Sequence, residues 1–185
     1  VILGILSLII SLFINIDFNP STNKTDEKVA KASDFNIHSF ITKEAVPVAI
    51  VMMIIGLNYA SILTFLKSFA EQRDLVEASS YFFICYAVAS LITRPIAGRL
   101  IDARSENVVV YPAFIALIIT FILLVFSHSS WMLLLSGVFL GIGYGNLSSS
   151  MQAIAIKVSP SSKYGIATST YFIGLDVGIG FGPSL

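Results

Sequence analysis

The sequence VVVYPAFIALIITFILLVF at residues 108–126 contains no charged side chain. Its apolar residues run continuously and do not alternate with polar ones, which favours a helix over a half-buried strand. A helix of about 20 apolar residues crosses the hydrocarbon core of a bilayer. Because a helix also satisfies its own backbone hydrogen bonds in lipid, residues 108–126 predict a transmembrane helix.

Five further apolar stretches flank this one, at residues 1–16, 45–66, 79–98, 131–156 and 166–185. The chain opens at Val1 without a methionine and stops at Leu185, in both cases inside an apolar stretch. We therefore expect a fragment of a longer protein, with its first and last spans cut short. The predicted fold class is all-α, a polytopic helical membrane bundle.

The composition agrees with a membrane protein. Of the 185 residues, 56% are hydrophobic and only 12% are charged, against about a quarter charged in soluble domains. The net charge is zero, which excludes the basic surface that nucleic-acid binding needs. Cys85 has no second cysteine to pair with, and only two histidines are present. We expect no metal site, no cofactor and no enzymatic activity.

The loops between the spans differ in their basic residues. The first, third and fifth loops carry nine Lys and Arg, and the second and fourth carry two. Basic residues are enriched in cytoplasmic loops, so we place the first, including residues 17–44, and the third and fifth in the cytoplasm. The nine are Lys24, Lys28, Lys31, Lys43, Arg94, Arg99, Arg104, Lys157 and Lys163, and the two are Lys67 and Arg73.

Asp176 lies about ten residues into the last span, roughly 15 Å along a helix and near the bilayer midplane. A charge at that depth costs about 2.5–3.5 kcal/mol on insertion scales. Two interpretations remain open. Asp176 is either a proton-titrating or cation-contacting carboxylate in a cavity, or an acid hydrogen-bonded between helices for packing.

Polar side chains gather within two spans where lipid-facing residues would be apolar. They form either the lining of a substrate cavity or interhelical hydrogen bonds, each worth about 0.6 kcal/mol. The pattern occurs in two different spans, which favours the cavity. The candidates are Asn58, Tyr59 and Ser61 in residues 45–66, and Tyr144, Asn146, Ser149 and Gln152 in residues 131–156.

Glycines recur at every fourth position of the last span, as Gly174, Gly178 and Gly182, followed by Pro183. This spacing puts the three on one helix face, where another helix can approach closely. The sequence predicts a helix that packs tightly and bends at its end.

A basic segment, Arg94 to Arg104, ends the third span. Its basic side chains extend to the interface and set topology. Asp102, placed just beyond the helix end, is suited to accept N–H bonds at the start of another helix. Arg99 and Asp102 are three residues apart and are expected to pair if this segment stays helical.

These motifs resemble the major facilitator superfamily, in particular its bacterial drug/proton-antiporter-like branch. The residues Gly98-Arg99-Leu100-Ile101-Asp102, with Ala103-Arg104, are similar to the second copy of that family's loop motif, Gly-x-Leu-x-Asp-Arg-x-Gly-Arg. The segment from Gly178 to Pro183 is similar to the Gly-x-x-x-Gly-Pro motif of antiporter helices. The loop match is partial, because Ala103, Ser105 and Glu106 replace a basic residue, a glycine and a basic residue.

The resemblance implies spans six to eleven of a twelve-helix transporter. Residues 1–16 would end span six, residues 17–44 would join the two halves, and residues 45–185 would form a truncated C-terminal half. It also implies that Arg94, Gly98, Arg99 and Asp102 latch this half to the missing N-terminal half, and that Asp176 couples protons.

The predicted function is secondary transport by alternating access, with proton-coupled efflux of a small amphipathic or metabolite-like compound. The predicted partners are this small-molecule substrate, protons, the lipid bilayer and the N-terminal half. The predicted location is the cell membrane, as a bacterial cytoplasmic membrane protein. Two alternatives remain: proton-coupled uptake of a small solute, or a non-transporting sensor or structural membrane subunit.

Overall fold

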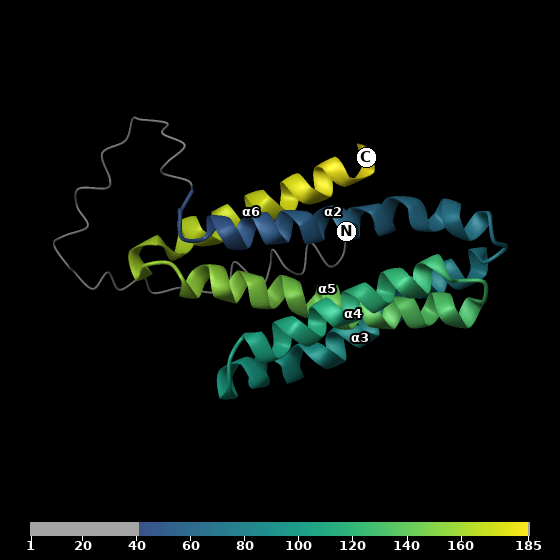
Figure 1. Cartoon of the computed structure of the whole chain (residues 1–185), viewed down its shortest axis with the longest axis horizontal. Helices are drawn as coiled ribbons and strands as arrows, with labels where there is room; N and C mark the ends of the chain where they lie inside the picture. Colours follow the sequence, from purple (N-terminus) through teal and green to yellow (C-terminus); the bar gives the residue numbers. More distant parts are fainter. Residues whose placement is uncertain (1–40, 185) are drawn as a thin grey trace, which may run out of the picture. The chain divides into compact units, whose positions relative to one another are not determined.

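The computed structural model describes residues 41–184, which lie in a single compact unit (Figure 1). The predictions for residues 1–16 and 17–40 fall outside the described residues. The helices are α2 (Val46–Glu71), α3 (Val76–Ala103), α4 (Asn107–Val125), α5 (Ser130–Lys157) and α6 (Tyr164–Phe181), with short 3₁₀ turns η3 (Ser161–Lys163) and η4 (Gly182–Ser184).

The all-α class is confirmed, because residues 41–184 contain helices and no strand. Four of the helices, α2 to α5, are long and apolar enough to cross a membrane. The α4 helix matches its predicted span of 108–126 to within one residue at each end. Many large side chains on the outer faces are apolar and exposed, among them Leu91 at 75% and Tyr111 at 67%, as expected for surfaces in contact with lipid.

The fifth helix differs from the other four. The sequence predicts a span at 166–185, and α6 does form there, but it has 18 residues and is not among the four membrane-length apolar helices. Its sequence includes Asp176 together with several Gly, Ser and Thr residues. These residues lower its mean hydropathy, so length and hydropathy alone identify α6 less clearly.

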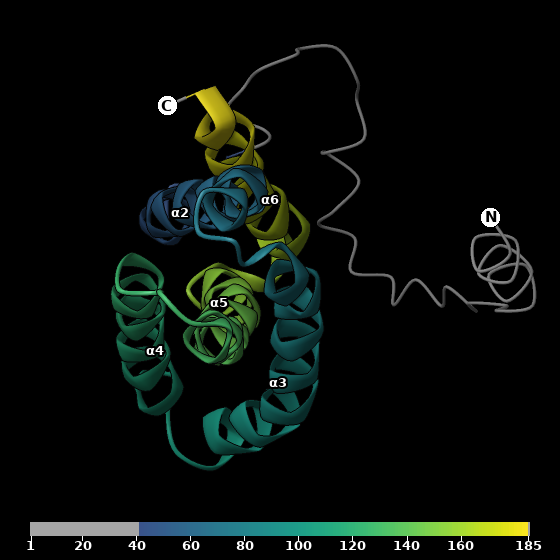
Figure 2. The same cartoon turned by 90° about the vertical axis from the view of Figure 1, so that its right-hand side faces the viewer.

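The α3 helix is longer than its predicted span of 79–98. It runs from Val76 to Ala103 and contains Pro95. A proline removes one backbone hydrogen bond and bends a helix without having to end it. The hydroxyl of Thr93 donates to the carbonyl of Ala89 just before Pro95, and Figure 2 shows α3 curving along its length. The segment predicted as a loop, Gly98 to Asp102, is therefore the last part of α3.

The central helix of the described unit is α5. Figure 2 shows it between α3 and α4, with α2 and α6 on a third side. The closest helix pairs are α3 with α5, α2 with α6, and α4 with α5. Leu133, Leu140 and Leu147 of α5 are fully buried, because the residues at this spacing point inward on a central helix.

Consecutive helices run in opposite directions and define two ends of the bundle. The α3–α4 turn, the α5–α6 turn and the start of α2 lie at one end, called here the Arg104 end. The α2–α3 and α4–α5 turns lie at the other, called the Arg73 end, where Arg73 donates hydrogen bonds to the carbonyls of Val125 and Ser127. The Arg104 end is the one whose loops we predict to be cytoplasmic.

Candidate functional site

A cavity of about 240 Å³ opens between α3 and α5 toward the Arg104 end. Residues 94, 98 and 102 of α3 recur every fourth position and so share one helix face. The structure thus brings part of the basic segment together with part of the polar face of α5. The lining residues are Arg94, Ala97, Gly98, Ile101 and Asp102 of α3, and Asn146, Ser149, Ser150 and Ala153 of α5.

Asn146 joins the two walls of this cavity. Its Nδ2 donates to Thr93 Oγ1 of α3 at 3.0 Å and to the carbonyl of Ile142 at 2.7 Å. Its Oδ1 is buried and has no hydrogen-bond partner among residues 41–184, and neither has the buried hydroxyl of Ser150. Leaving a buried polar atom unpaired costs about 1–3 kcal/mol. Two residues that line the cavity therefore each carry a buried polar atom that residues 41–184 leave unpaired.

The segment predicted to latch two halves lies on the exposed end of α3. Asp102 is exposed and lies within the last turn of the helix, not beyond its end as the sequence suggested. Arg99 is exposed too, and the ion pairs formed within residues 41–184 do not include one between Arg99 and Asp102. A Cβ added at Gly98 would meet no atom within 4 Å. The described helices therefore leave open space at Gly98.

A cluster of three tyrosines joins α2, α3 and α5. The rings of Tyr59 and Tyr144 are stacked, with centroids 3.8 Å apart and planes at 6°. The ring of Tyr86 lies 6.1 Å from that of Tyr59, tilted by 34°. Two of the predicted cavity residues are thus in direct contact. The sequence analysis missed Tyr86, because its span showed no run of polar residues around it.

The other predicted cavity residues do not join this cluster. Asn58 Nδ2 donates to the carbonyl of Ile54 and Ser61 Oγ to that of Leu57, both one turn earlier in α2. Ser149 Oγ likewise donates to the carbonyl of Gly145. Ser61 lines an apolar groove between α2 and α4 instead, and Gln152 is half-buried. Of the predicted set, Asn146 and Ser149 line the cavity between α3 and α5.

Asp176 lies on a face of α6 that no described helix covers. Its side chain is exposed, as are Phe172 and Gly180, four residues before and after it. No hydrogen bond or ion pair to Asp176 forms within residues 41–184. The carboxylate thus points away from the helices that pack α6 into the unit.

The opposite face of α6 carries the predicted glycines. A Cβ added at Gly174, Gly178 or Gly182 would come closer than 3.0 Å to atoms of α2, mostly of its backbone. For Gly178 those atoms include the carbonyl of Met53. The α2 and α6 backbones therefore approach as closely as missing side chains allow. Pro183 lies in the 3₁₀ turn η4 that follows α6.

An ion pair at the Arg104 end was not predicted. Lys157, the last residue of α5, contacts Glu106 Oε1 at 2.6 Å just before α4 begins. The hydrogen bond from Lys157 lowers the pKa of the Glu106 carboxyl below its ordinary value. Glu106 is one of the three residues that depart from the loop motif, and its carboxylate, which replaces a basic residue, is paired with Lys157 within the same unit. No three His, Cys, Asp or Glu side chains within residues 41–184 gather as metal ligands would.

Comparison with protein families gave one result. A family model described as Major Facilitator Superfamily matches residues 1–185. Comparison with curated proteins and with solved structures found no match.

Proposed function

The chain belongs to the major facilitator superfamily, and from this premise we propose that it forms part of a proton-coupled secondary transporter that exports a small amphipathic or metabolite-like compound. The chain is a multi-pass membrane protein, and transporters of this kind alternate between two rocking states around a midplane site. A bacterial cytoplasmic membrane is the proposed location.

The observation that carries proton coupling is the position of Asp176. Its carboxylate is exposed on α6, within a helix that packs against α2 by the opposite face. An acid facing lipid at that depth is costly, and intramembrane acids face a watery cavity or a partner as a rule. Within residues 41–184 no helix supplies a packing partner for this acid, so such a partner would have to come from the N-terminal half. We favour a water-accessible carboxylate that binds and releases a proton.

The cavity between α3 and α5 supports a substrate or water pathway. Asn146 Oδ1 and the Ser150 hydroxyl are buried beside it without partners in the described part of the chain. Such groups are stabilised when a polar ligand or water reaches them. The tyrosine cluster of Tyr59, Tyr86 and Tyr144 offers an aromatic wall nearer the middle of α5. An amphipathic solute matches this combination of polar and aromatic groups.

The end of α3 is proposed as a contact with the other half of the transporter. Arg94, Gly98 and Asp102 share one face, and Arg99 extends from the same helical segment. The described helices leave Gly98 open and Asp102 without an ion pair. A helix of the N-terminal half would fit against this open segment in one of the two states.

The test is transport by the intact protein in liposomes under an imposed pH gradient, with a panel of amphipathic amines and short carboxylic acids. Asp176→Asn should keep the protein folded and lower gradient-driven movement by roughly tenfold or more, since the amide does not titrate. Asp74→Asn is the matched control, because Asp74 is an exposed acid in the α2–α3 turn with a φ of 57° that asparagine tolerates.

The outcomes separate the alternatives. Full activity of Asp176→Asn with an unchanged pH profile would leave Asp176 as a packing residue. If the solute moves in the same direction as the protons, the protein takes it up and does not export it. The direction of transport would then be reversed, and proton coupling would stand. If the wild type moves no member of the panel, the sensor or structural subunit becomes the better interpretation.

A further inference from the structure

A second pocket, of about 290 Å³, lies at the Arg73 end between the starts of α3 and α5. It is separate from the cavity at the Arg104 end, and its lining includes none of the site residues discussed above. The lining residues are Glu77, Ala78 and Tyr81 of α3 and Ser130, Trp131 and Leu134 of α5.

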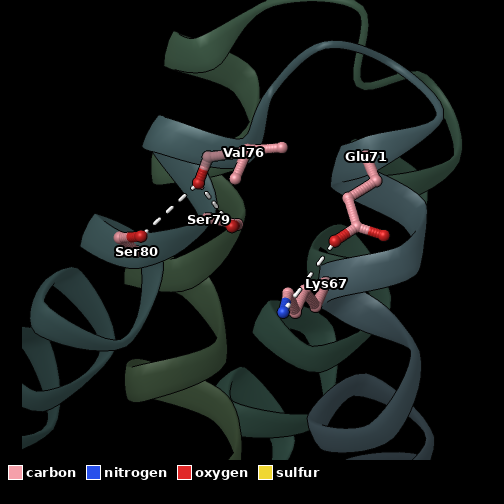
Figure 3. Close-up of polar contacts among 5 residues, drawn as sticks. All are labelled: Lys67, Glu71, Val76, Ser79 and Ser80. Carbon is pink, nitrogen blue, oxygen red and sulfur yellow. Dashed lines mark hydrogen bonds and ion pairs between the residues drawn. The ribbon is translucent and has the colours of Figure 1, made fainter.

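The charge of this pocket is negative. Glu77 is exposed and is its only titratable acid or base besides the Tyr81 phenol, since no Lys, Arg or His is among the lining residues. Nearby, Glu71 is paired with Lys67 at 3.9 Å (Figure 3). Glu77 forms no such pair within residues 41–184. Its carboxylate is therefore available to a cation from outside the unit.

The serine hydroxyls near Glu77 already donate hydrogen bonds within α3. Ser79 and Ser80 both turn back to the carbonyl of Val76, at 2.7 and 3.5 Å, as Figure 3 shows. Glu77 and Tyr81 lie four residues apart on one face of α3 and line the pocket together. The pocket thus pairs a carboxylate with aromatic rings.

The aromatic side chains suit a position among lipid headgroups. Trp131 is 80% exposed and Tyr81 is 52% exposed, each in the first turns of a membrane-length helix. Tryptophan and tyrosine concentrate at this level of a bilayer because their rings are amphipathic. Their π faces attract ammonium groups.

An apolar surface continues from the pocket toward the middle of the helices. On α3, Ile84 and Val88 follow Tyr81 at helical spacing and are 57% and 51% exposed. On α5, Leu135 follows Trp131 by one turn and is 47% exposed. A headgroup in the pocket would therefore have its acyl chains against apolar side chains.

We propose that this pocket binds the ammonium headgroup of a zwitterionic phospholipid, with Glu77 opposite the nitrogen and Trp131 and Tyr81 against it. The proposal is independent of proton coupling, because it concerns lipid contact at the end of the bundle remote from the α3–α5 cavity. It predicts a preference for phosphatidylethanolamine over phosphatidylglycerol, whose headgroup has no ammonium.

The experiment is native mass spectrometry of the intact protein released from detergent with phosphatidylethanolamine or phosphatidylglycerol. Glu77→Gln and Trp131→Leu should each lower retention of phosphatidylethanolamine by about two- to fivefold and leave phosphatidylglycerol unchanged. Glu71→Gln is the matched control, since that acid is already paired at the same end, and it should retain both lipids as the wild type does.

Further arms test the source and the role of the contact. Excess free ethanolamine should displace little lipid if the acyl chains contribute, and complete displacement would reassign the pocket to a soluble amine. Glu77 also lies in the first turn of α3, where a negative charge stabilises the helix by interacting with its dipole. If Glu77→Gln lowers only the melting temperature, or if Trp131→Leu leaves the lipid preference intact, the headgroup site is wrong. Equal loss of both lipids, or protection of Trp131 by other helices of the protein, would also overturn it.

Discussion

The two helix pairs α2–α6 and α3–α5 differ in how far glycine closes their contact. Along α2–α6, Gly174, Gly178 and Gly182 bring the backbones together over the length of the contact. Along α3–α5, glycines of α5 do the same near the middle, but the contact then opens into the cavity beside Gly98, where an added Cβ would meet no atom of another described helix within 4 Å. The first pair is closed along its length, and the second is closed in the middle and open at the Arg104 end.

This difference predicts that the two helix pairs differ in rigidity within one compact unit. A contact made through backbone atoms has little freedom to repack, because interiors respond poorly to added or lost volume. An open contact with unpaired polar atoms costs less to rearrange. We therefore expect α2–α6 to move as a rigid pair and the end of α3 to be where shape changes during transport.

The largest expected effect is on the closed pair. Gly178→Ala places a methyl group against the carbonyl of Met53 and should destabilise the protein by about 1–3 kcal/mol, the usual cost of overpacking. Gly180→Ala is the control on the same helix, because a Cβ there meets nothing within 4 Å. It should be neutral or stabilise by up to ~1 kcal/mol. Thermal unfolding in detergent measures both, and equal melting temperatures would remove the contrast between the two glycines.

An intermediate effect is expected at the open end. Gly98→Leu should leave the melting temperature nearly unchanged, since the position has free space. By blocking close approach of the other half, it should shift the population towards the inward-open state. Asp102→Asn should shift it in the same direction, by roughly 2- to 30-fold for a carboxylate at a helix N-terminus of the other half. Cysteine accessibility of the cavity between α3 and α5 reports the shift. If neither variant changes accessibility, the segment sets topology only.

The smallest effect concerns the ion pair between Glu106 and Lys157. Because Lys157 lowers the pKa of Glu106, the pair stabilises the folded protein at neutral pH, and this contribution is lost as pH falls through the lowered pKa. Glu106→Gln should therefore lower the melting temperature slightly at neutral pH and make no difference in acid. High salt should reduce the difference, since exposed pairs are screened. A melting-temperature difference that grows on acidification would contradict this sign.

Hydropathy was sufficient to predict the all-α class and the bounds of α4 and α5. It failed at the end of α3 because Arg99 and Asp102 read as loop residues, although the helix continues through them to Ala103. The span predicted at 166–185 does correspond to α6, although the Asp, Gly, Ser and Thr residues of this helix lower its mean hydropathy. The local pattern of apolar residues predicts that a stretch is a transmembrane helix. How far that helix extends beyond the membrane depends on backbone hydrogen bonds, which hydropathy does not measure.

The candidate site was predictable in type and less so in detail. Spacing along α5 indicated a polar face, and Asn146 and Ser149 do line a cavity. Spacing could not show that Asn58 and Ser61 bond to their own helix, since serine and asparagine hydrogen-bond to carbonyls one turn back as readily as across helices. Nor could it pair Thr93 with Asn146 or stack Tyr59 on Tyr144, because those contacts depend on how separate helices are rotated.

The pairing of α2 with α6 also bears on how the protein is made. The end of α2, Glu71, and the start of α6, Tyr164, are separated by roughly 90 residues. At about 5–20 residues per second the ribosome therefore completes α2 roughly 5 to 19 seconds before it begins α6. During that interval the backbone face of α2 that will receive the α6 glycines has no partner from this unit. Helices α3 to α5 are synthesised in the meantime, and α6 must then reach α2 on the side that they leave uncovered. Correct folding of this unit therefore requires that the face of α2 that receives α6 stays uncovered until α6 has been synthesised.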